Sequence, residues 1–380
     1  MTNPLRVAVI GAGRLGGFHA QKLARRSDVT LTAIVDPLPA SRQRIAAECQ
    51  TEARADCTGL LDELDAAIVA APTSLHYDIA RQLLEAGIHL LVEKPLCTTA
   101  AKADELVAAA RRRNVVLQVG HVERFNPAFQ AAAAELRRPK YIEAVRANGF
   151  TFRSMDVGVV LDLMIHDIDL VLSLVQSPLR SVEALGVSVL GSHEDVANAR
   201  LHFECGCVAA LSACRVSHES VRRMQVWSPR VFAGVDFAAR TTTLVRPNKT
   251  LRRRQFHVDQ LTPEQLEYQR GHFAEEQLPC EQLCFDAVDA LVLEQEDFLA
   301  AILASGQPRV SGQAGRDALA VAEQILAAIR GHCWDASDDG PVGPWALPRR
   351  QFVPAPHFPL MGNGATAIAG DAQHALIDCW

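Results

Sequence analysis

The sequence predicts an α/β protein in which a doubly wound parallel sheet precedes an α+β domain with a largely antiparallel, open-faced sheet. Its 380 residues suit two domains better than one. Up to about residue 122, short β-branched runs alternate with longer amphipathic stretches, which is typical of βαβ units. Beyond that point, β-type runs follow one another at hairpin spacing, which indicates a second kind of sheet.

In the first domain, residues 1–122, strands are expected where Val, Ile, Leu and Ala cluster, and helices where Ala, Leu, Arg and Glu dominate. The expected strands are residues 7–10, 31–35, 67–70, 89–92 and 115–119. The expected helices are residues 16–24, 41–49, 77–86 and 101–112.

The second domain is expected to span residues 123–332, and the Pro- and Gly-rich residues 333–380 form a C-terminal extension. Its expected strands are residues 141–150, 182–190, 199–203, 208–216, 224–227 and 231–237. Its expected helices are residues 127–136, 159–175, 281–304 and 312–330.

Composition and charge exclude several classes of protein. The chain is 49% hydrophobic and 22% charged, as soluble globular proteins are on average. Its net charge of −6 is spread along the sequence, which argues against nucleic acid or a membrane surface as the main partner. The first residues lack the features of a signal peptide, and no apolar run is long enough to span a membrane. We therefore expect a cytoplasmic protein, and since the cysteines lack zinc-site spacing, no metal.

A glycine-rich segment follows the first expected strand directly and opens a helix. Gly11 permits the tight turn, Gly13 lets the backbone approach a pyrophosphate, and Gly16 allows close helix packing. The free N–H groups and positive dipole end of the helix would face the phosphates. The segment, with Arg14 and Leu15 between its glycines, therefore predicts a dinucleotide site of the Rossmann type.

Asp36 predicts which dinucleotide binds. It ends the second strand, twenty residues after Gly16, where a carboxylate would accept hydrogen bonds from the adenosine ribose. The same charge would repel the 2′-phosphate of NADP, and Pro37 to Pro39 offer no arginine to hold one. NAD is therefore the expected cofactor.

Three further side chains are candidates for catalysis. Lys94 follows the strand at residues 89–92, in the crevice where parallel sheets bind ligands, and Pro95 fixes the chain beside it. The alternative is a surface ion pair with Glu93. Asp162 and His166 are four residues apart on an expected helix, so both can point into one cleft.

Residues 86–95, AGIHLLVEKP, resemble the AGxHVxxEKP segment of the Gfo/Idh/MocA oxidoreductase family, and the similarity extends over residues 5 to about 330. The resemblance implies that the loop after the fourth strand lies along the nicotinamide and that Glu93, Lys94 and Pro95 contact the cofactor. That loop contributes Ala71, Pro72, Thr73 and His76 to the expected site.

The resemblance also implies a reaction in which a base takes the proton of a secondary alcohol while hydride leaves for the nicotinamide. His166 is the expected base, Asp162 its partner or a substrate ligand, and Lys94 the stabiliser of the alkoxide. The family often has glycines before this helix, where residues 156–161 read DVGVVL.

Residues 120–127, GHVERFNP, are similar to members that oxidise the 3-hydroxyl of UDP-N-acetylglucosamine-type sugars. Arg124 could bind a diphosphate or carboxylate and Asn126 a hydroxyl or acetamido group. The alternative is that Arg124 pairs with Glu123 at the domain junction. The expected substrate ligands are His121, Glu123, Arg124, Asn126 and Asp169.

Three functions remain open from the sequence. The first is a nucleotide-sugar 3-dehydrogenase, and the second is a dehydrogenase of free polyols or monosaccharides such as inositol. The third is a catalytically silent NAD-binding regulator. The open face of the second sheet is a natural subunit interface, so a homodimer or homotetramer is expected.

Overall fold

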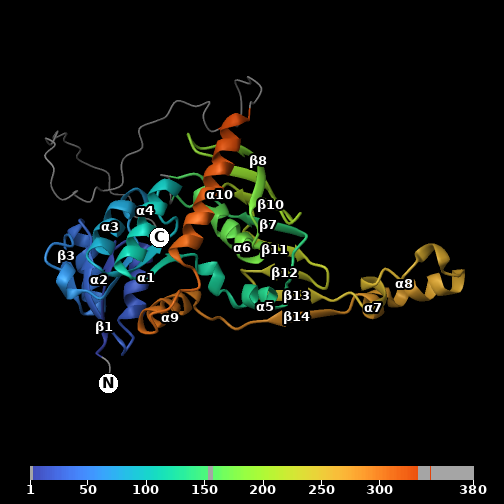
Figure 1. Cartoon of the computed structure of the whole chain (residues 1–380), viewed down its shortest axis with the longest axis horizontal. Helices are drawn as coiled ribbons and strands as arrows, with labels where there is room; N and C mark the ends of the chain where they lie inside the picture. The colour runs from blue at the N-terminus through green and yellow to red at the C-terminus, as the bar shows by residue number, and fades with distance from the viewer. Residues whose placement is uncertain (1–2, 153–156, 333–342, 344–380) are drawn as a thin grey trace.

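The computed structural model describes residues 3–152, 157–332 and 343, and these form two sheets with helices packed around them (Figure 1). The first sheet has six parallel strands in the order β3-β2-β1-β4-β5-β6. Its strands are β1 (Leu5–Ile10), β2 (Val29–Val35), β3 (Glu52–Arg54), β4 (Ala66–Val69), β5 (His89–Glu93) and β6 (Leu117–Gly120). Its helices are α1 (Arg14–Leu23), α2 (Pro39–Cys49), α3 (Thr73–Glu85) and α4 (Ala100–Arg113), with a short turn η1 (Leu61–Glu63).

Both faces of this sheet are covered, which explains why its strands read as continuous apolar runs. Val7 and Val9 pack on the side of α1 and α2, whereas Ala8 and Ile10 pack on the side of α3 and α4. All four are fully buried. Helix α1 begins directly after β1, so its N-terminus lies at the carboxyl end of the sheet.

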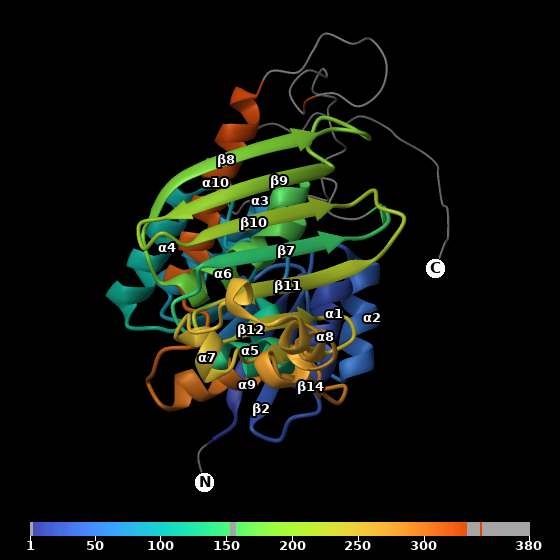
Figure 2. The same ribbon diagram turned by 90° about the vertical axis from the view of Figure 1, so that its right-hand side faces the viewer.

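The second sheet has eight strands in the order β14-β13-β12-β11-β7-β10-β9-β8, and β7 with β10 is its one parallel pair. Its strands are β7 (Tyr141–Ala147), β8 (Leu179–Val187), β9 (Val196–Phe203), β10 (Val208–Cys214), β11 (Val221–Trp227), β12 (Phe232–Asp236), β13 (Thr241–Val245) and β14 (Cys280–Cys284). Its central strands alternate buried with more exposed residues. Figure 2 shows α6 and α10 behind the sheet and the opposite face open.

Four helices of the second half pack on the sheets: α5 (Pro127–Glu135), α6 (Ile165–Val175), α9 (Ala290–Leu303) and α10 (Gly312–Gly331). A turn η2 (Val122–Phe125) connects the two sheets, and a π-helical turn η3 (Val160–Met164) leads into α6. Helix α9 returns to the first sheet, where Phe298 and Leu299 join the apolar cluster beside α1. Helix α10 contacts α4 as well as α6 and β8, so it ties the two halves together.

The predicted fold class is confirmed, with corrections to individual elements. The predicted helix at 281–304 is wrong at its start, because residues 280–284 form the edge strand β14 and α9 begins at Ala290. Strands β3 and β13 were not predicted, nor was the helical segment between β13 and β14, which contains α7 (Lys249–Arg252), η4 (Val258–Gln260) and α8 (Pro263–Gln277). The predicted extension at 333–380 lies outside the described residues apart from residue 343.

No helix among the described residues is both long and apolar enough to cross a membrane.

Candidate active site

The glycine-rich loop has the shape that a dinucleotide site needs. Gly11 has φ +105°, and a Cβ there would lie 2.5 Å from the carbonyl oxygen of Ala70. A Cβ on Gly16 would lie 1.8 Å from the carbonyl oxygen of Gly11. Nothing stands within 4 Å of a Cβ built on Gly13, and Arg14 and Leu15 are exposed. The loop is therefore packed tightly beneath and open above, as a bound pyrophosphate requires.

Asp36 ties this loop to the end of β2. One carboxylate oxygen accepts the N–H of Ala12 at 2.7 Å and the other accepts the N–H of Leu38 at 2.8 Å. Arg42, on α2, donates to the carbonyl oxygens of Asp36 and Pro37. The carboxylate is thus fixed beside the glycine loop while its remaining lone pairs stay available to a ribose.

The loops after β4 and β5 are held together by a buried histidine. The ring nitrogens of His76 lie 2.8 Å from the carbonyl oxygens of Pro95 and Ala71. Pro72 precedes α3, which begins at Thr73. His76 therefore positions the two predicted nicotinamide loops. Because its side chain is buried, the geometry favours this structural role over direct contact with the cofactor.

Lys94 and Asp162 meet across the two halves of the chain. The Nζ atom of Lys94 donates to the Oδ1 of Asp162 at 3.0 Å and to its carbonyl oxygen at 2.7 Å. Both side chains are partly exposed. The predicted alternative, a surface ion pair between Lys94 and Glu93, is not formed, because Glu93 is buried and contacts His19 instead.

His166 lies beside this pair on the first turn of α6. Its pKa is lowered well below its ordinary value, first because of burial and then because of the positive charges of Lys94 and Arg146. The ring of His121 stands perpendicular to it at 6.1 Å between centroids. Burial also lowers the pKa of His121. Three buried ring nitrogens have no hydrogen-bond partner among the described residues: both nitrogens of His121 and the Nδ1 of His166.

The π-helical turn before α6 was not predicted. Residues 160–164 form η3, and α6 continues from Ile165, so Asp162 and His166 lie on either side of the change. Gly158 precedes the turn, and a Cβ there would lie 2.0 Å from the Oε1 of Glu194. Such turns are frequent at functional sites because they change where side chains point. Residue 156, part of the approach noted in the sequence, lies outside the described range.

A buried ion network lies behind His166. Arg146 on β7 donates to Asp167 at 2.8 and 3.1 Å and to Glu123 at 2.6 Å. Burial opposes the charge of Arg146, but the two carboxylates hold its pKa above the ordinary range. Burial raises the pKa of Asp167 in spite of this pairing. Reasoning from sequence missed Arg146, which lies 21 and 23 residues from its partners.

The other predicted substrate ligands have partners within the protein. Arg124 pairs with Asp169 through contacts of 2.6 and 3.2 Å, and not with Glu123 as the sequence alternative proposed. Asn126 accepts the N–H of Ala128 at the start of α5 and donates to Glu123. Glu123 and Asn126 are buried, so the geometry favours a structural role for both over contact with a substrate.

A second buried cluster lies beneath the loop that carries Lys94. The Nε2 of His19 lies 2.8 Å from Glu93, and Gln295 contacts the other ring nitrogen. Possible ligand atoms of His19, Glu93 and Glu294 lie within 4.8 Å of one another, which is close enough to share a metal ion, but His19 and Glu93 already bond each other. Burial raises the pKa of Glu294 well above its ordinary value, and the charge of Glu93 adds to this. Burial thus favours the protonated form of Glu294, whose two carboxyl oxygens have no hydrogen-bond partner among the described residues.

Comparison with known proteins identifies the family. Residues 5–121 match the model of an oxidoreductase family with an NAD-binding Rossmann fold, and residues 128–229 match the GFO/IDH/MocA C-terminal domain. The chain belongs to the Gfo/Idh/MocA family. The family confirms the predicted oxidoreductase activity, the Rossmann fold and NAD as the cofactor.

Two curated members of the Gfo/Idh/MocA family are especially informative. UDP-N-acetylglucosamine 3-dehydrogenase of Acidithiobacillus ferrooxidans is 37% identical over 329 residues, which are 86% of this chain and 97% of that protein. The NAD⁺-dependent scyllo-inositol 2-dehydrogenase of Bacillus subtilis is 30% identical over 57% of this chain and 69% of its own length.

Two solved structures agree with the fold. The Acidithiobacillus enzyme superposes with a TM-score of 0.75 at 36% identity, covering 87% of this chain and 99% of that one. A levoglucosan dehydrogenase in complex with NADH reaches a TM-score of 0.73 at 17% identity, covering 87% of this chain and 98% of its own, and so supports the fold alone.

Proposed function

We propose that the protein is an NAD-dependent dehydrogenase that oxidises the 3-hydroxyl of a UDP-N-acetylglucosamine-type sugar. The observation that carries the chemistry is the meeting of Lys94, Asp162 and His166 at the carboxyl end of the first sheet. The substrate class is supported by the relative that matches this chain over 97% of its own length.

His166 is the proposed base. Its lowered pKa keeps the imidazole neutral at neutral pH, so it can accept the hydroxyl proton. Because its Nδ1 is buried, Nε2 is the nitrogen that would receive the proton. Lys94 would hold the oxygen of the substrate as negative charge develops on it. Asp162 would orient Lys94, because its carboxylate accepts a hydrogen bond from the Nζ atom of Lys94.

The cofactor residues fit NAD. The open space above Gly13, the N-terminus of α1 and the carboxylate of Asp36 match pyrophosphate and ribose groups. When bound, NAD supplies the hydride acceptor. The proposed lining of this site remains Gly11, Arg14, Leu15, Gly16, Ala71, Pro72, Thr73, Glu93 and Pro95. Arg124, which is partly exposed, is the proposed border of the sugar pocket. His121 and Asp169 are buried, as Glu123 and Asn126 are, and would support that border from within the protein.

A dehydrogenase of free polyols is the second candidate, because the scyllo-inositol enzyme is also a relative. Cytoplasmic location, a homodimer or homotetramer formed through the open face, and the division at residues 122 and 332 are further proposals. The domain division is not a simple cut of the chain at residue 122, because helix α9 packs on the first sheet.

A substrate panel tests the proposal. Purified protein is incubated with NAD and either UDP-sugars or free polyols, and the absorbance of reduced nicotinamide is followed. We expect turnover with UDP-N-acetylglucosamine. Turnover with inositol alone would favour the second candidate, and no turnover despite tight NAD binding would favour a silent regulator.

His166→Ala tests the base directly. Loss of a positioned base should lower kcat by about 10²- to 10⁴-fold, while the dissociation constant of NAD changes little. His257→Ala, at an exposed histidine, is the matched control. Normal turnover in His166→Ala would remove this residue from the base role.

A further inference from the structure

A long helical arm interrupts the edge of the second sheet. Strands β13 and β14 pair antiparallel, with Val245 opposite Cys280, and the chain between them leaves the sheet and returns to the same place. This arm, residues 246–279, contains α7, η4 and α8 and projects far from the rest of the molecule (Figure 1). Figure 2 shows it in front of the sheet, on the open side.

The arm lacks a packed core of its own. Of the 15 residues in α8, only Gln277 is buried. Val258, Leu266 and Tyr268 are 61%, 37% and 50% exposed. The rings of Phe256 and Phe273 contact each other at 5.5 Å between centroids, which is little support for the segment. A helix of this length is marginal in water unless one of its faces is packed. Contact with a partner surface would therefore stabilise the arm.

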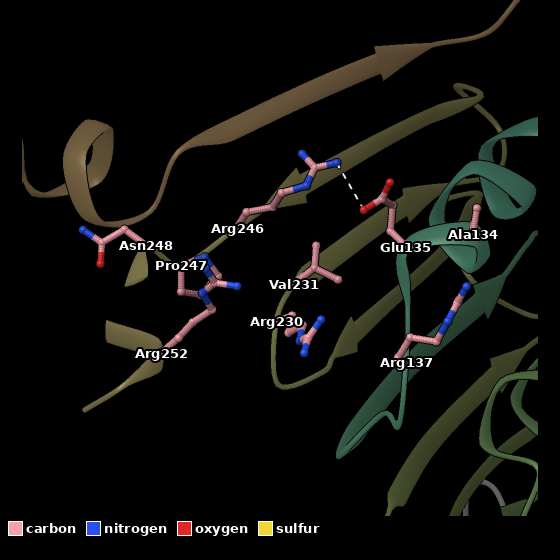
Figure 3. Close-up of a pocket in the computed structure, with 9 residues that line it drawn as sticks. All are labelled: Ala134, Glu135, Arg137, Arg230, Val231, Arg246, Pro247, Asn248 and Arg252. Carbon is pink, nitrogen blue, oxygen red and sulfur yellow. Dashed lines mark ion pairs between the residues drawn. The ribbon is translucent and has the colours of Figure 1, made fainter. Parts of the chain in front are cut away.

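A positively charged cavity of about 500 Å³ lies at the root of the arm (Figure 3). It is formed by the end of α5, the turn before β12 and the chain from β13 into α7. Its lining contains four arginines and a single carboxylate, and no residue of α8: Ala134, Glu135, Arg137, Arg230, Val231, Arg246, Pro247, Asn248 and Arg252.

The charges in this cavity are only partly balanced. Arg246 pairs with Glu135 at 3.5 Å and with Glu281 at 2.7 Å. Within the described part of the chain, Arg230 and Arg252 have no ion pair with a carboxylate, and both are exposed. The cavity therefore carries an excess of positive charge.

Helix α8 carries the opposite charge. Its sequence contains four glutamates and one arginine. Glu267 pairs with Arg270, and Glu276 accepts a hydrogen bond from Tyr268. The described residues offer no ion-pair partner to Glu264 or Glu275. The helix thus brings spare negative charge and exposed apolar side chains together.

We propose that α8 of one copy docks into the arginine cavity of a second copy, and that the exchange is reciprocal. A closed two-fold interface requires that one chain carry both complementary surfaces, and this chain does. No residue of α8 lines the cavity of its own subunit, and α8 meets the wall of this cavity at its last turn, where Asn248 donates to Glu276 and Gln277.

Charge decides among the possible occupants. Nucleic acid would be attracted to the arginines but repelled by a chain of net charge −6, and it would leave the glutamates of α8 without partners. A small anion such as UDP would neutralise the arginines but leave the apolar side chains of the arm uncovered. A second copy would both neutralise the arginines of the cavity and cover the apolar side chains of the arm.

Two charge-reversal variants of the full chain test the exchange. The cavity variant is Arg230→Glu with Arg252→Glu, and the helix variant is Glu264→Arg with Glu275→Arg. Each alone places like charges opposite each other, so we expect the dissociation constant of the affected interface to rise about tenfold or more. Analytical ultracentrifugation should show a shift to smaller species. High salt should weaken the wild-type assembly as well.

Mixing the two variants is the decisive measurement. The negative cavity then faces a positive helix, and the remaining cavity and helix are unchanged, so the mixture should recover the wild-type assembly. Arg44→Glu with Arg112→Glu, at exposed arginines of the first half, is the matched control and should leave assembly unchanged. Circular dichroism and NAD binding would show that each variant folds.

A monomeric wild type would overturn the proposal, as would variants that assemble normally or a mixture that recovers nothing. Loss of UDP binding in the cavity variant without any change in assembly would also overturn it, and would assign the cavity to a small anion instead.

Discussion

Asp36 fixes the adenosine end of the cofactor site with one charged group, and this determines nucleotide preference. The wild-type protein should bind NAD more tightly than NADP. In Asp36→Asn the charge that repels a 2′-phosphate is gone, so NADP affinity should rise and NAD affinity should fall by about tenfold, the value of one charged hydrogen bond. Fluorescence titration of both reduced nucleotides measures this. Asp62→Asn, at an exposed carboxylate, is the control, and tighter NADP binding by the wild type would contradict the assignment.

The lowered pKa of His166 predicts the pH dependence of activity. A base works in its neutral form, so activity is full at higher pH and is lost as the pH falls through the pKa of the folded protein. Since burial and positive charges place that pKa well below the ordinary value of about 6.5, the acid limb of kcat/KM should also lie well below it. A limb centred at 6.5 or higher would show that another group governs the profile.

Single side chains differ in how far the sequence could predict them. Gly11, Gly13 and Gly16 were predictable because their constraint is local to the turn that they form. Lys94 and Asp162 were predictable as candidates, but their mutual contact joins positions 68 residues apart. The pairing of Arg124 with Asp169 depends on the docking of η2 against α6, which a pattern in the sequence does not specify.

At the scale of elements, the Glu123–Arg146–Asp167 network joins η2, β7 and α6 behind the proposed base. Arg146→Met would leave two carboxylates buried without their cation. Breaking a buried pair in this way should cost about 3–5 kcal/mol of unfolding free energy. Chemical denaturation measures the loss, and circular dichroism checks the fold.

Two companion variants make this prediction specific. Adding Glu123→Gln and Asp167→Asn should recover part of the stability, because the uncompensated charges are then removed. Arg180→Met, at the exposed pair with Glu204, should lower the free energy of unfolding far less, because surface ion pairs add little to stability. Equal losses in Arg146→Met and Arg180→Met would mean that the network adds little.

The periodic elements of the first sheet could be predicted because each strand is buried on both faces and each helix is amphipathic. Strand β14 could not, because its residues 280–284 run into a helical pattern and form an exposed edge. The helix α8 of the arm could not be predicted either, because its few apolar side chains do not form a stripe that packs against this subunit.

For the whole molecule, α9 is the element that returns the chain to the first sheet, and Glu294 is its buried acid. The raised pKa means that the folded state holds a proton that the unfolded chain releases above about pH 4.3. Stability therefore falls as pH rises from that value to the pKa of the folded state. Glu294→Gln removes this cost, so its melting temperature should exceed that of the wild type by a margin that grows as the pH rises above about 4.3 toward the pKa of the folded state.

Thermal unfolding at several pH values measures that margin, and Glu296→Gln, an exposed neighbour on α9, is the control. A constant or shrinking margin would mean that Glu294 is ionised in the folded protein and needs another explanation for its burial.

The root of the arm has a consequence for how such a protein can change. Because β13 and β14 are adjacent antiparallel strands, the two ends of the arm lie about one strand spacing apart, near 4.8 Å. A two-residue turn could replace the whole insertion while the strand register stays the same. Lineages could thus lengthen, shorten or discard the arm without disturbing the catalytic half, and an engineer could graft a reporter domain at the same point.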